Sequence, residues 1–432
     1  MRQIFSDKLL GPGMVGAAFK VAGVGLSFLF MKAVTHISGA EGWGLYSICA
    51  TVALLGVSAA RLGVDTVLVK QIGQARALGQ YHRLGRALRQ STWAVLGVSL
   101  GLAIALWLAA PLLSQLFGKP QLRYYLPIVA LWIPPWALLF LFTEGLRGFG
   151  RAAAFQFLQT GMPFLLSMVL LAPVLLGYLP AFTADVPLIT YGLGLSASCL
   201  VAFLVLRRAF HQAYGDSTRA RHSFRAMRQT ALPILSTYLL AVGLGQADVL
   251  LLGYLRPSAE AGLYATALRL SYLTLLPVQA LGGMAAANLA GLHATGRGRE
   301  LAYTLRRTGR LVRLGTLPLW AGLCLASPLA MGFFGGQFVA AWPVLVWLAT
   351  NQFFNALCGP IDVLLQMTGQ ERYYRNIIGL ALGVNLVANV VFIPWLGLYG
   401  AALAQTLGMV CWNVAGLIRI HRAYGVWLLR VW

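Results

Sequence analysis

The sequence predicts an all-α polytopic membrane protein of about twelve transmembrane helices, arranged as two six-helix pseudo-repeats. Apolar runs, a low charge content and an internal repeat support this prediction. Of the 432 residues, 59% are hydrophobic and 10% are charged, whereas a soluble domain carries about 25% charged residues. Apolar runs of about 20 residues recur along the chain, and each can cross ~30 Å of hydrocarbon as a helix. These runs lack the in/out alternation of a membrane β-barrel.

The predicted spans fall into two sets of six, bounded in many places by Gly and Pro. Those of the first half cover residues 12–35, 43–72, 91–116, 125–146, 154–178 and 188–206. Those of the second half cover residues 231–255, 261–290, 314–334, 342–366, 377–394 and 399–418.

The net charge of +22 reflects membrane topology rather than nucleic-acid binding. With the N-terminus placed in the cytoplasm, 25 of the 33 Lys and Arg residues fall on inner segments, and three fall in outer loops: Lys119, Arg123 and Arg256. The positive-inside rule then places both termini in the cytoplasm. The same rule places there a basic connector, 216–230, between an N-terminal lobe, 1–215, and a C-terminal lobe, 231–432.

An internal repeat relates the two lobes. Gly44-Leu-Tyr46 recurs as Gly262-Leu-Tyr264, a shift of 218, and Leu146-Arg-Gly-Phe-Gly150 is echoed by Leu365-Gln-Met-Thr-Gly369, a shift of 219. Pro111 to Gly118 recurs from Pro328 at a shift of 217. Six spans per copy is an even number, so both copies enter from one side and the pseudo-two-fold axis should run along the membrane normal.

The second predicted span carries a family resemblance. The segments that carry it are Gly39-Ala-Glu-Gly-Trp-Gly-Leu-Tyr46, Arg61-Leu-Gly-Val-Asp-Thr-Val-Leu-Val-Lys70 and, before the last span, Tyr399-Gly-Ala-Ala402. They resemble segments of the multidrug/oligosaccharidyl-lipid/polysaccharide exporter superfamily, in particular of its bacterial O-antigen and exopolysaccharide repeat-unit flippases. The resemblance implies a V-shaped two-lobe transporter whose spans one, two, seven and eight line a central cavity. It also implies an undecaprenyl-pyrophosphate-linked oligosaccharide cargo, moved from the inner to the outer leaflet of the bacterial inner membrane for polysaccharide or lipopolysaccharide synthesis. Membrane lipids, a polymerase and a chain-length regulator are the implied partners.

Ionisable residues deep in the predicted spans are candidates for a transport pathway because they are costly in hydrocarbon. In the first lobe these are Lys20, Arg61 and Asp65. On one interpretation, Arg61 and Asp65 neutralise each other and lock two helices together. On the other, Lys20 and Arg61 form a cationic seat, that is, a positively charged binding site, for a pyrophosphate. The planar guanidinium of arginine can donate two parallel hydrogen bonds to phosphate oxygens.

In the second lobe, Asp248 and Arg269 are predicted at one depth on neighbouring antiparallel spans, where an ion pair is easy to form. This pair is either a static clasp or a switch in which Asp248 exchanges Arg269 for H⁺ or Na⁺. Asn385 and Asn389, four residues apart on one helix, either bind sugar hydroxyls or bond to one another. Gly97 and Gly101 predict a close helix contact.

The sequence argues against an enzyme. Its loops reach about 25 residues at most, too short for a catalytic domain, and a membrane glycan polymerase or ligase usually has a large external loop. The sequence contains no HExxH or CxxC spacing, so neither a metal nor an organic cofactor is expected beyond a coupling ion. A cation-coupled drug or metabolite exporter of the same fold is the alternative function.

Overall fold

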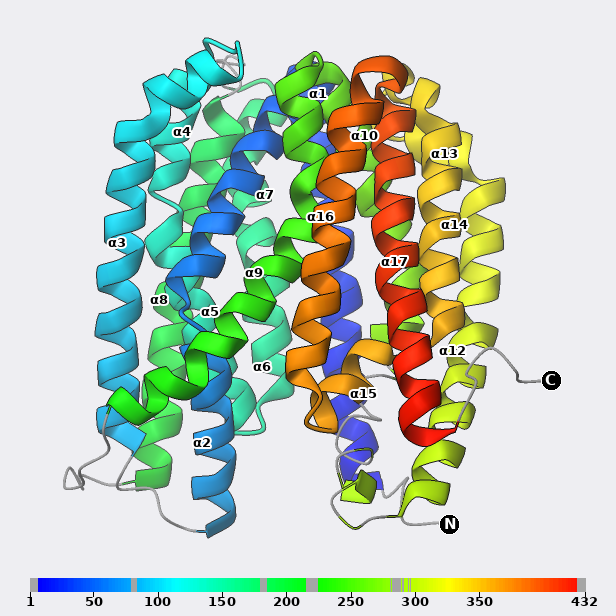
Figure 1. The fold of residues 1–432 in the computed structure, drawn as a ribbon. Helices are drawn as coiled ribbons and strands as arrows, with labels where there is room; N and C mark the ends of the chain where they lie inside the picture. Colours follow the sequence, from blue (N-terminus) through cyan, green and yellow to red (C-terminus); the bar gives the residue numbers. More distant parts are fainter. Residues whose placement is uncertain are drawn as a thin grey trace. The chain divides into compact units, whose positions relative to one another are not determined.

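We describe the protein from a computed structural model. The structure describes residues 7–78, 84–178, 185–214, 224–279 and 297–425, together with residues 281, 289, 291–293 and 295. Every regular element in these ranges is a helix (Figure 1). Of the expected connector, residues 216–223 lie outside the described residues, and residues 224–230 belong to the start of a long helix.

The first helix, α1, contains the first predicted span and the first part of the second. It runs over Asp7–Ala60, and its backbone leaves helical geometry inside this range at Gly39, where φ is 64° and ψ is −165°. Its apolar part covers 43 residues, which rise ~65 Å at 1.5 Å per residue. This length is about twice the ~30 Å thickness of the hydrocarbon, so α1 supplies the first span and the beginning of the second.

One compact unit comprises residues 1–38 and 49–239. After α1 it contains α2 (Val64–Leu78), α3 (Leu84–Leu116), α4 (Leu122–Ala130), α5 (Ile133–Gly148), α6 (Ala152–Gln156), the π-helix η3 (Phe157–Gly161), α7 (Met162–Leu175), α8 (Asp185–Tyr214) and the first half of α9 (Phe224–Leu255).

A second compact unit comprises residues 39–48 and 240–432. Beyond α9 it contains α10 (Ser258–Ser271), the 3₁₀-helix η4 (Tyr272–Leu275), α12 (Gly298–Leu325), α13 (Ser327–Gly332), the 3₁₀-helix η5 (Gly336–Ala341), α14 (Trp342–Cys358), α15 (Ile361–Met367), α16 (Glu371–Leu396) and α17 (Leu398–Tyr424). The lobe limits of 1–215 and 231–432 stay a prediction.

The repeated sequence motifs have matching backbone conformations. Gly150 follows α5 with φ at 77°, and its repeat partner Gly369 follows α15 with φ at 73°. A left-handed residue at a helix end strongly favours glycine because glycine lacks a Cβ. The two glycines therefore terminate equivalent helices in the two repeats.

Eight helices of the described residues are long and apolar enough to cross a membrane, or nine if the pair 336–358 and 361–367, bent by 42°, is one span. The difference from twelve has local causes. α1 merges two spans, α10 has 14 residues, and α12 begins with a basic stretch that includes Arg306, Arg307 and Arg310. The predicted eighth span also extends into residues 282–288, which lie outside the described residues.

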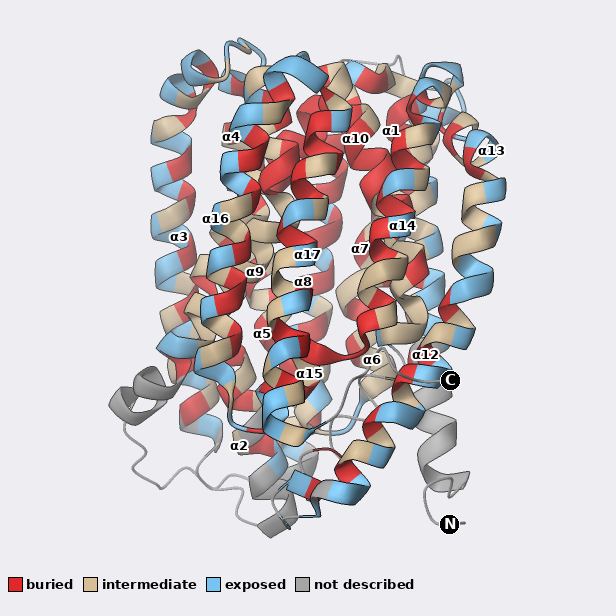
Figure 2. Ribbon diagram, turned by 45° about the vertical axis from the view of Figure 1, so that its right-hand side comes forward, coloured by how far each residue is buried: buried red, intermediate tan, exposed pale blue. Residues whose placement is uncertain are grey.

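Buried, intermediate and exposed residues alternate along the helices, so most helices have one buried and one exposed face (Figure 2). Trp43 and Tyr264 are fully buried, whereas Leu108 on α3 is 66% exposed. Gly97 and Gly101 on α3 do not make the expected close contact: a Cβ built on either meets no described atom within 4 Å. That prediction is wrong because this part of α3 faces outward.

Candidate functional site

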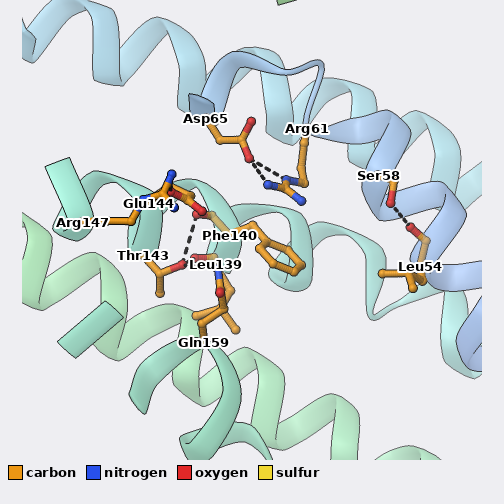
Figure 3. Close-up of polar contacts among 10 residues, drawn as sticks. All are labelled: Leu54, Ser58, Arg61, Asp65, Leu139, Phe140, Thr143, Glu144, Arg147 and Gln159. Carbon is orange, nitrogen blue, oxygen red and sulfur yellow. Dashed lines mark hydrogen bonds and ion pairs between the residues drawn. The ribbon is translucent and has the colours of Figure 1, made fainter. Parts of the chain in front are cut away.

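Arg61 and Asp65 flank a break between α1 and α2. The helix ends at Ala60, and Leu62 and Gly63 follow with φ values of 53° and 69°. A left-handed leucine costs roughly 1–2 kcal/mol, so the surrounding packing must hold this corner. The break lets the Arg61 side chain turn back onto the first turn of α2. There its Nε donates to Asp65 Oδ2 at 2.7 Å, and its Nη2 pairs with the same oxygen (Figure 3).

Two aromatic rings hold the Arg61 guanidinium. Its Cζ lies 4.3 Å from the ring centroid of Phe140 on α5 and 4.5 Å from that of Tyr238 on α9. Arg61 is 8% exposed and Asp65 is 2% exposed. A desolvated cation over an aromatic face gains up to about 2 kcal/mol per ring. The site is therefore a buried ion pair supported by aromatic contacts.

Helix α9 packs directly on the same break. A Cβ built on Gly63 would lie 2.5 Å from the Ala231 carbonyl oxygen and 3.1 Å from the Leu235 nitrogen. Around this contact Val64, Val67 and Ala231 form a small buried cluster. Residue 63 must therefore be glycine both for its left-handed backbone and for the approach of α9.

A second acidic group lies on α5 next to the pair. Glu144 is 8% exposed, and its Oε2 lies 2.8 Å from Nη2 of Arg147, one turn further on, as Figure 3 shows. The sequence pattern does not predict that a buried Glu144 lies beside the Arg61–Asp65 pair.

Lys20 lies on α1 and is half-buried. Around it α1 packs on the π-helix: a Cβ built on Gly23 would lie 2.8 Å from Thr160 Oγ1. The contact partners of Arg61 are Asp65, Phe140 and Tyr238, and Lys20 is not among them. The predicted cationic seat of Lys20 and Arg61 for a pyrophosphate stays a prediction.

Asp248 is the centre of a polar cluster in the second unit. It is fully buried on α9. Its Oδ1 accepts hydrogen bonds from Nδ2 of Asn385 at 2.8 Å and from Nδ2 of Asn389 at 2.7 Å. Its Oδ2 accepts one from the Tyr264 hydroxyl at 2.9 Å. Three uncharged donors from α10 and α16 therefore solvate this carboxylate.

The two asparagines are also bonded to one another. Asn389 Nδ2 donates to Asn385 Oδ1 at 3.1 Å and to the Asn385 carbonyl oxygen at 2.9 Å. Both side chains are fully buried, so in this structure they contact Asp248 and each other. The predicted contact with sugar hydroxyls stays a prediction.

Arg269 has a different environment from the one expected. Its Cζ lies 4.8 Å from the ring centroid of Trp43, while the partners of Asp248 are the neutral groups just named. The expected Asp248–Arg269 ion pair is therefore wrong for this structure. Tyr264, the last residue of a repeated Gly-Leu-Tyr motif, occupies the position beside Asp248 that the arginine was expected to take.

Comparison with known proteins identifies the family. Residues 14–286 match the family described as polysaccharide biosynthesis protein, a match that includes Lys20, Arg61, Asp65, Asp248 and Arg269. The chain belongs to this family.

One relative of this polysaccharide biosynthesis protein is itself a flippase by name. A probable low-salt glycan biosynthesis flippase, Agl15 of Haloferax volcanii, is 26% identical over 161 residues, which are 37% of this chain and 34% of that protein. The aligned segment therefore spans about a third of the curated relative.

Solved structures share the fold along nearly the whole chain. A multidrug resistance MATE family transporter of the MOP superfamily, in an inward-facing conformation, matches with a TM-score of 0.70 at 14% identity, covering 96% of this chain and 98% of that one. The lipid II flippase MurJ, in an inward closed conformation, matches with a TM-score of 0.70 at 12% identity, covering 95% and 87%. The family match confirms the resemblance to polysaccharide-exporting proteins, and the solved structures confirm the all-α polytopic fold class.

Sequence reasoning about this family member missed the aromatic residues of both clusters. The apolar spans contain many aromatic residues, and nothing in the pattern indicates that Phe140, Tyr238 and Trp43 are the ones that face an arginine. Tyr264 could have been found because it belongs to the internal repeat. Among the described residues, no group of three His, Cys, Asp or Glu side chains could hold a metal ion.

Proposed function

We propose that this protein is a flippase for undecaprenyl-pyrophosphate-linked oligosaccharide repeat units, which it moves from the inner to the outer leaflet by alternating access. The observation that carries the proposal is the family match over residues 14–286, which takes in all five deeply placed ionisable residues predicted from the sequence. The similarity to Agl15, a glycan biosynthesis flippase by name, supports the same class of cargo.

The cargo's pyrophosphate requires cations that remain charged away from water. Arg61 and Arg269 meet this need because a guanidinium stays protonated and offers a planar fork to phosphate oxygens. In this structure Asp65 Oδ2 accepts the bonds from both Nε and Nη2 of Arg61. A pyrophosphate would take the place of this carboxylate, and Lys20, half-buried on α1, would add a third positive charge during transfer.

Asp248 is proposed as the group that couples flipping to a gradient of H⁺ or Na⁺. It is fully buried and its partners are uncharged, so its own negative charge has no compensating cation among them. Burying an unpaired carboxylate is costly, and a bound proton or Na⁺ would remove this cost. The unbonded, buried Oδ1 of Asn389 offers a further oxygen for a cation beside Asp248.

A cation-coupled drug or metabolite exporter is the second candidate. The fold similarity to a multidrug resistance MATE transporter favours it. The basic residues Lys20, Arg61 and Arg269 favour an anionic cargo instead.

We propose the bacterial inner membrane as the site of action, with both termini in the cytoplasm, where O-antigen, lipopolysaccharide or exopolysaccharide units are assembled. A polymerase and a chain-length regulator would then take over the flipped unit. The 25-to-3 division of basic residues between predicted inner and outer segments supports this orientation.

Reconstitution in liposomes tests the function. A fluorescent undecaprenyl-pyrophosphate oligosaccharide is placed in the membrane, and a membrane-impermeant quencher reports how much becomes accessible from outside. A flippase raises the accessible fraction at a rate that depends on the protein and on an imposed H⁺ or Na⁺ gradient. Uptake or efflux of a cationic dye in the same vesicles, with no movement of the lipid-linked sugar, would instead establish the exporter.

A further inference from the structure

A cavity of about 400 Å³ lies where α3 ends and α4 begins. This corner of the backbone is at the top left of Figure 1. Its lining includes Ser114, Gln115, Lys119, Arg123 and Tyr124. Binding cavities for small ligands measure ~300–1,000 Å³, so this one can receive a group of the size of a lipid headgroup. None of the roles proposed above uses it.

The loop that forms the cavity is held in place by its own hydrogen bonds. Ser114 Oγ donates to the Lys119 carbonyl oxygen at 3.0 Å, and the Lys119 amide donates to the Ser114 carbonyl oxygen at 3.0 Å. Gly118, between them, adopts φ of 61°. This double closure fixes the loop before any ligand binds, which reduces the entropy lost on binding.

The charge of the cavity is positive. Lys119 and Arg123 line it, and no acidic side chain is among the described residues that do so. These are two of the three cations that fall in predicted outer loops. Because positive-inside topology accounts for the inner cations and not for these, their convergence on one cavity requires another reason.

The membrane-facing side of the corner is apolar. Leu108, Leu112 and Leu116 follow one another at four-residue spacing on α3 and are 66%, 67% and 56% exposed. Residues spaced by four share a helix face, so they form a strip that leads along α3 to the cavity. Tyr124, at the cavity itself, is 71% exposed, as is usual for aromatic residues at the level of lipid headgroups.

We propose that this α3–α4 cavity binds the phosphodiester headgroup of an anionic phospholipid, with one acyl chain lying on the leucine strip. Arg123 would bind two phosphate oxygens through its fork, and Lys119 would contribute a point charge. Gln115 and Tyr124 would bond the polar remainder of the headgroup. The apolar strip favours a lipid over free phosphate, which would not use it.

Native mass spectrometry of the full chain in detergent tests this site with phosphatidylglycerol, phosphatidylcholine, inorganic phosphate and undecaprenyl pyrophosphate as separate probes. The wild type should retain one phosphatidylglycerol more firmly than phosphatidylcholine, and millimolar phosphate should not displace it. Lys119→Gln with Arg123→Gln should weaken this retention by roughly tenfold or more, since each lost contact is charge-assisted. Leu112→Ser should weaken retention of phosphatidylglycerol without removing its preference over phosphatidylcholine.

Arg306→Gln with Arg307→Gln is the matched control, because it removes two exposed positive charges from α12 that are not among the residues lining the cavity. It should leave the tightly retained lipid in place. Equal retention by the wild type and the Lys119/Arg123 variant, with unchanged thermal unfolding, would overturn the proposal. Displacement by phosphate alone would overturn the lipid assignment, and preference for undecaprenyl pyrophosphate would reassign the cavity to the cargo.

Discussion

Gly44 and Gly262, equivalent positions of the two sequence repeats, lie in direct backbone contact. A Cβ built on Gly44 would lie 1.8 Å from the Ser258 carbonyl oxygen and 3.1 Å from the Gly262 nitrogen. A Cβ built on Gly262 would lie 2.2 Å from the Ala40 carbonyl oxygen and 2.9 Å from the Gly44 nitrogen. The repeated Gly-Leu-Tyr motif is thus a helix-crossing point at which each copy makes room for the other.

Gly44→Ala and Gly262→Ala should each destabilise the protein. A methyl group at either position collides with backbone that cannot rotate away, and overpacking costs typically 1–3 kcal/mol or more. Thermal unfolding in detergent should show a clear fall in Tm for both variants. Gly97→Ala is the control, since its Cβ meets no described atom within 4 Å; it should leave Tm unchanged or slightly raised because alanine favours helix. An unchanged Tm for Gly44→Ala would contradict the observed crossing.

Removing one member of the Arg61–Asp65 pair should cost more than removing both. Arg61→Ala leaves a buried carboxylate without its cation, which costs about 3–5 kcal/mol. The double variant Arg61→Ala/Asp65→Ala should recover part of this loss, although it cannot restore the contacts with Phe140 and Tyr238. A double-mutant cycle on the free energy of unfolding measures the coupling.

The control for this cycle is Arg297→Ala. The Arg297 and Glu300 side chains form an ion pair and are 59% and 55% exposed, and such exposed pairs contribute at most about 1 kcal/mol. If Arg61→Ala is no more destabilising than Arg297→Ala, the Arg61–Asp65 pair does not stabilise the fold as a buried ion pair.

Asp248→Asn should abolish the dependence of flipping on an H⁺ or Na⁺ gradient. An amide can neither take up a proton in this range nor compensate a sodium ion, although it fits the same space. The liposome assay, run with and without each gradient, measures the effect. Glu260→Gln makes the same chemical change in a carboxylate that pairs with Arg256 and should keep the dependence. A variant at Asp248 that still responds to the gradients would remove Asp248 from the coupling mechanism.

Arg269→Gln should lower the rate of lipid-linked oligosaccharide transfer by roughly tenfold or more, because it removes a charge-assisted contact to phosphate. Lys20→Gln is expected to act in the same direction. The amount of protein in the membrane, measured by immunoblot, should not change. Arg256→Gln, which removes an arginine at the α9–α10 corner, should transfer cargo at the wild-type rate. Wild-type transfer by Arg269→Gln would exclude Arg269 from cargo binding.

The helices and the buried charges could be predicted from the sequence because both follow from local composition. An apolar run of about 20 residues has few alternatives to a membrane helix, and a charge within such a run is conspicuous. The repeat was also visible, since Gly150 and Gly369 retain glycine for the same left-handed backbone.

The partners of those charges could not be predicted, because they depend on how helices turn and approach one another. Depth counting placed Arg269 level with Asp248, but it could not show that Tyr264, on the same helix α10, would face the carboxylate instead. Depth counting also could not predict the break in the helix at Leu62 and Gly63, beside which Phe140 and Tyr238 pack against Arg61. Glycine spacing also did not predict where helices approach closely. Gly97 and Gly101, four residues apart, lie on an open helix face, whereas the close helix contact is at Gly44 and Gly262.

The Gly44–Gly262 crossing also imposes an order on biosynthesis. Residues 39–48 pack with the second compact unit, yet they leave the ribosome 218 positions before Gly262. At ~5–20 residues per second this interval is roughly 10–45 s. During that time the newly inserted N-terminal half must wait in the bilayer with its Trp43 segment uncovered, so this segment is where a membrane chaperone or a quality-control protease would first meet the unfinished chain.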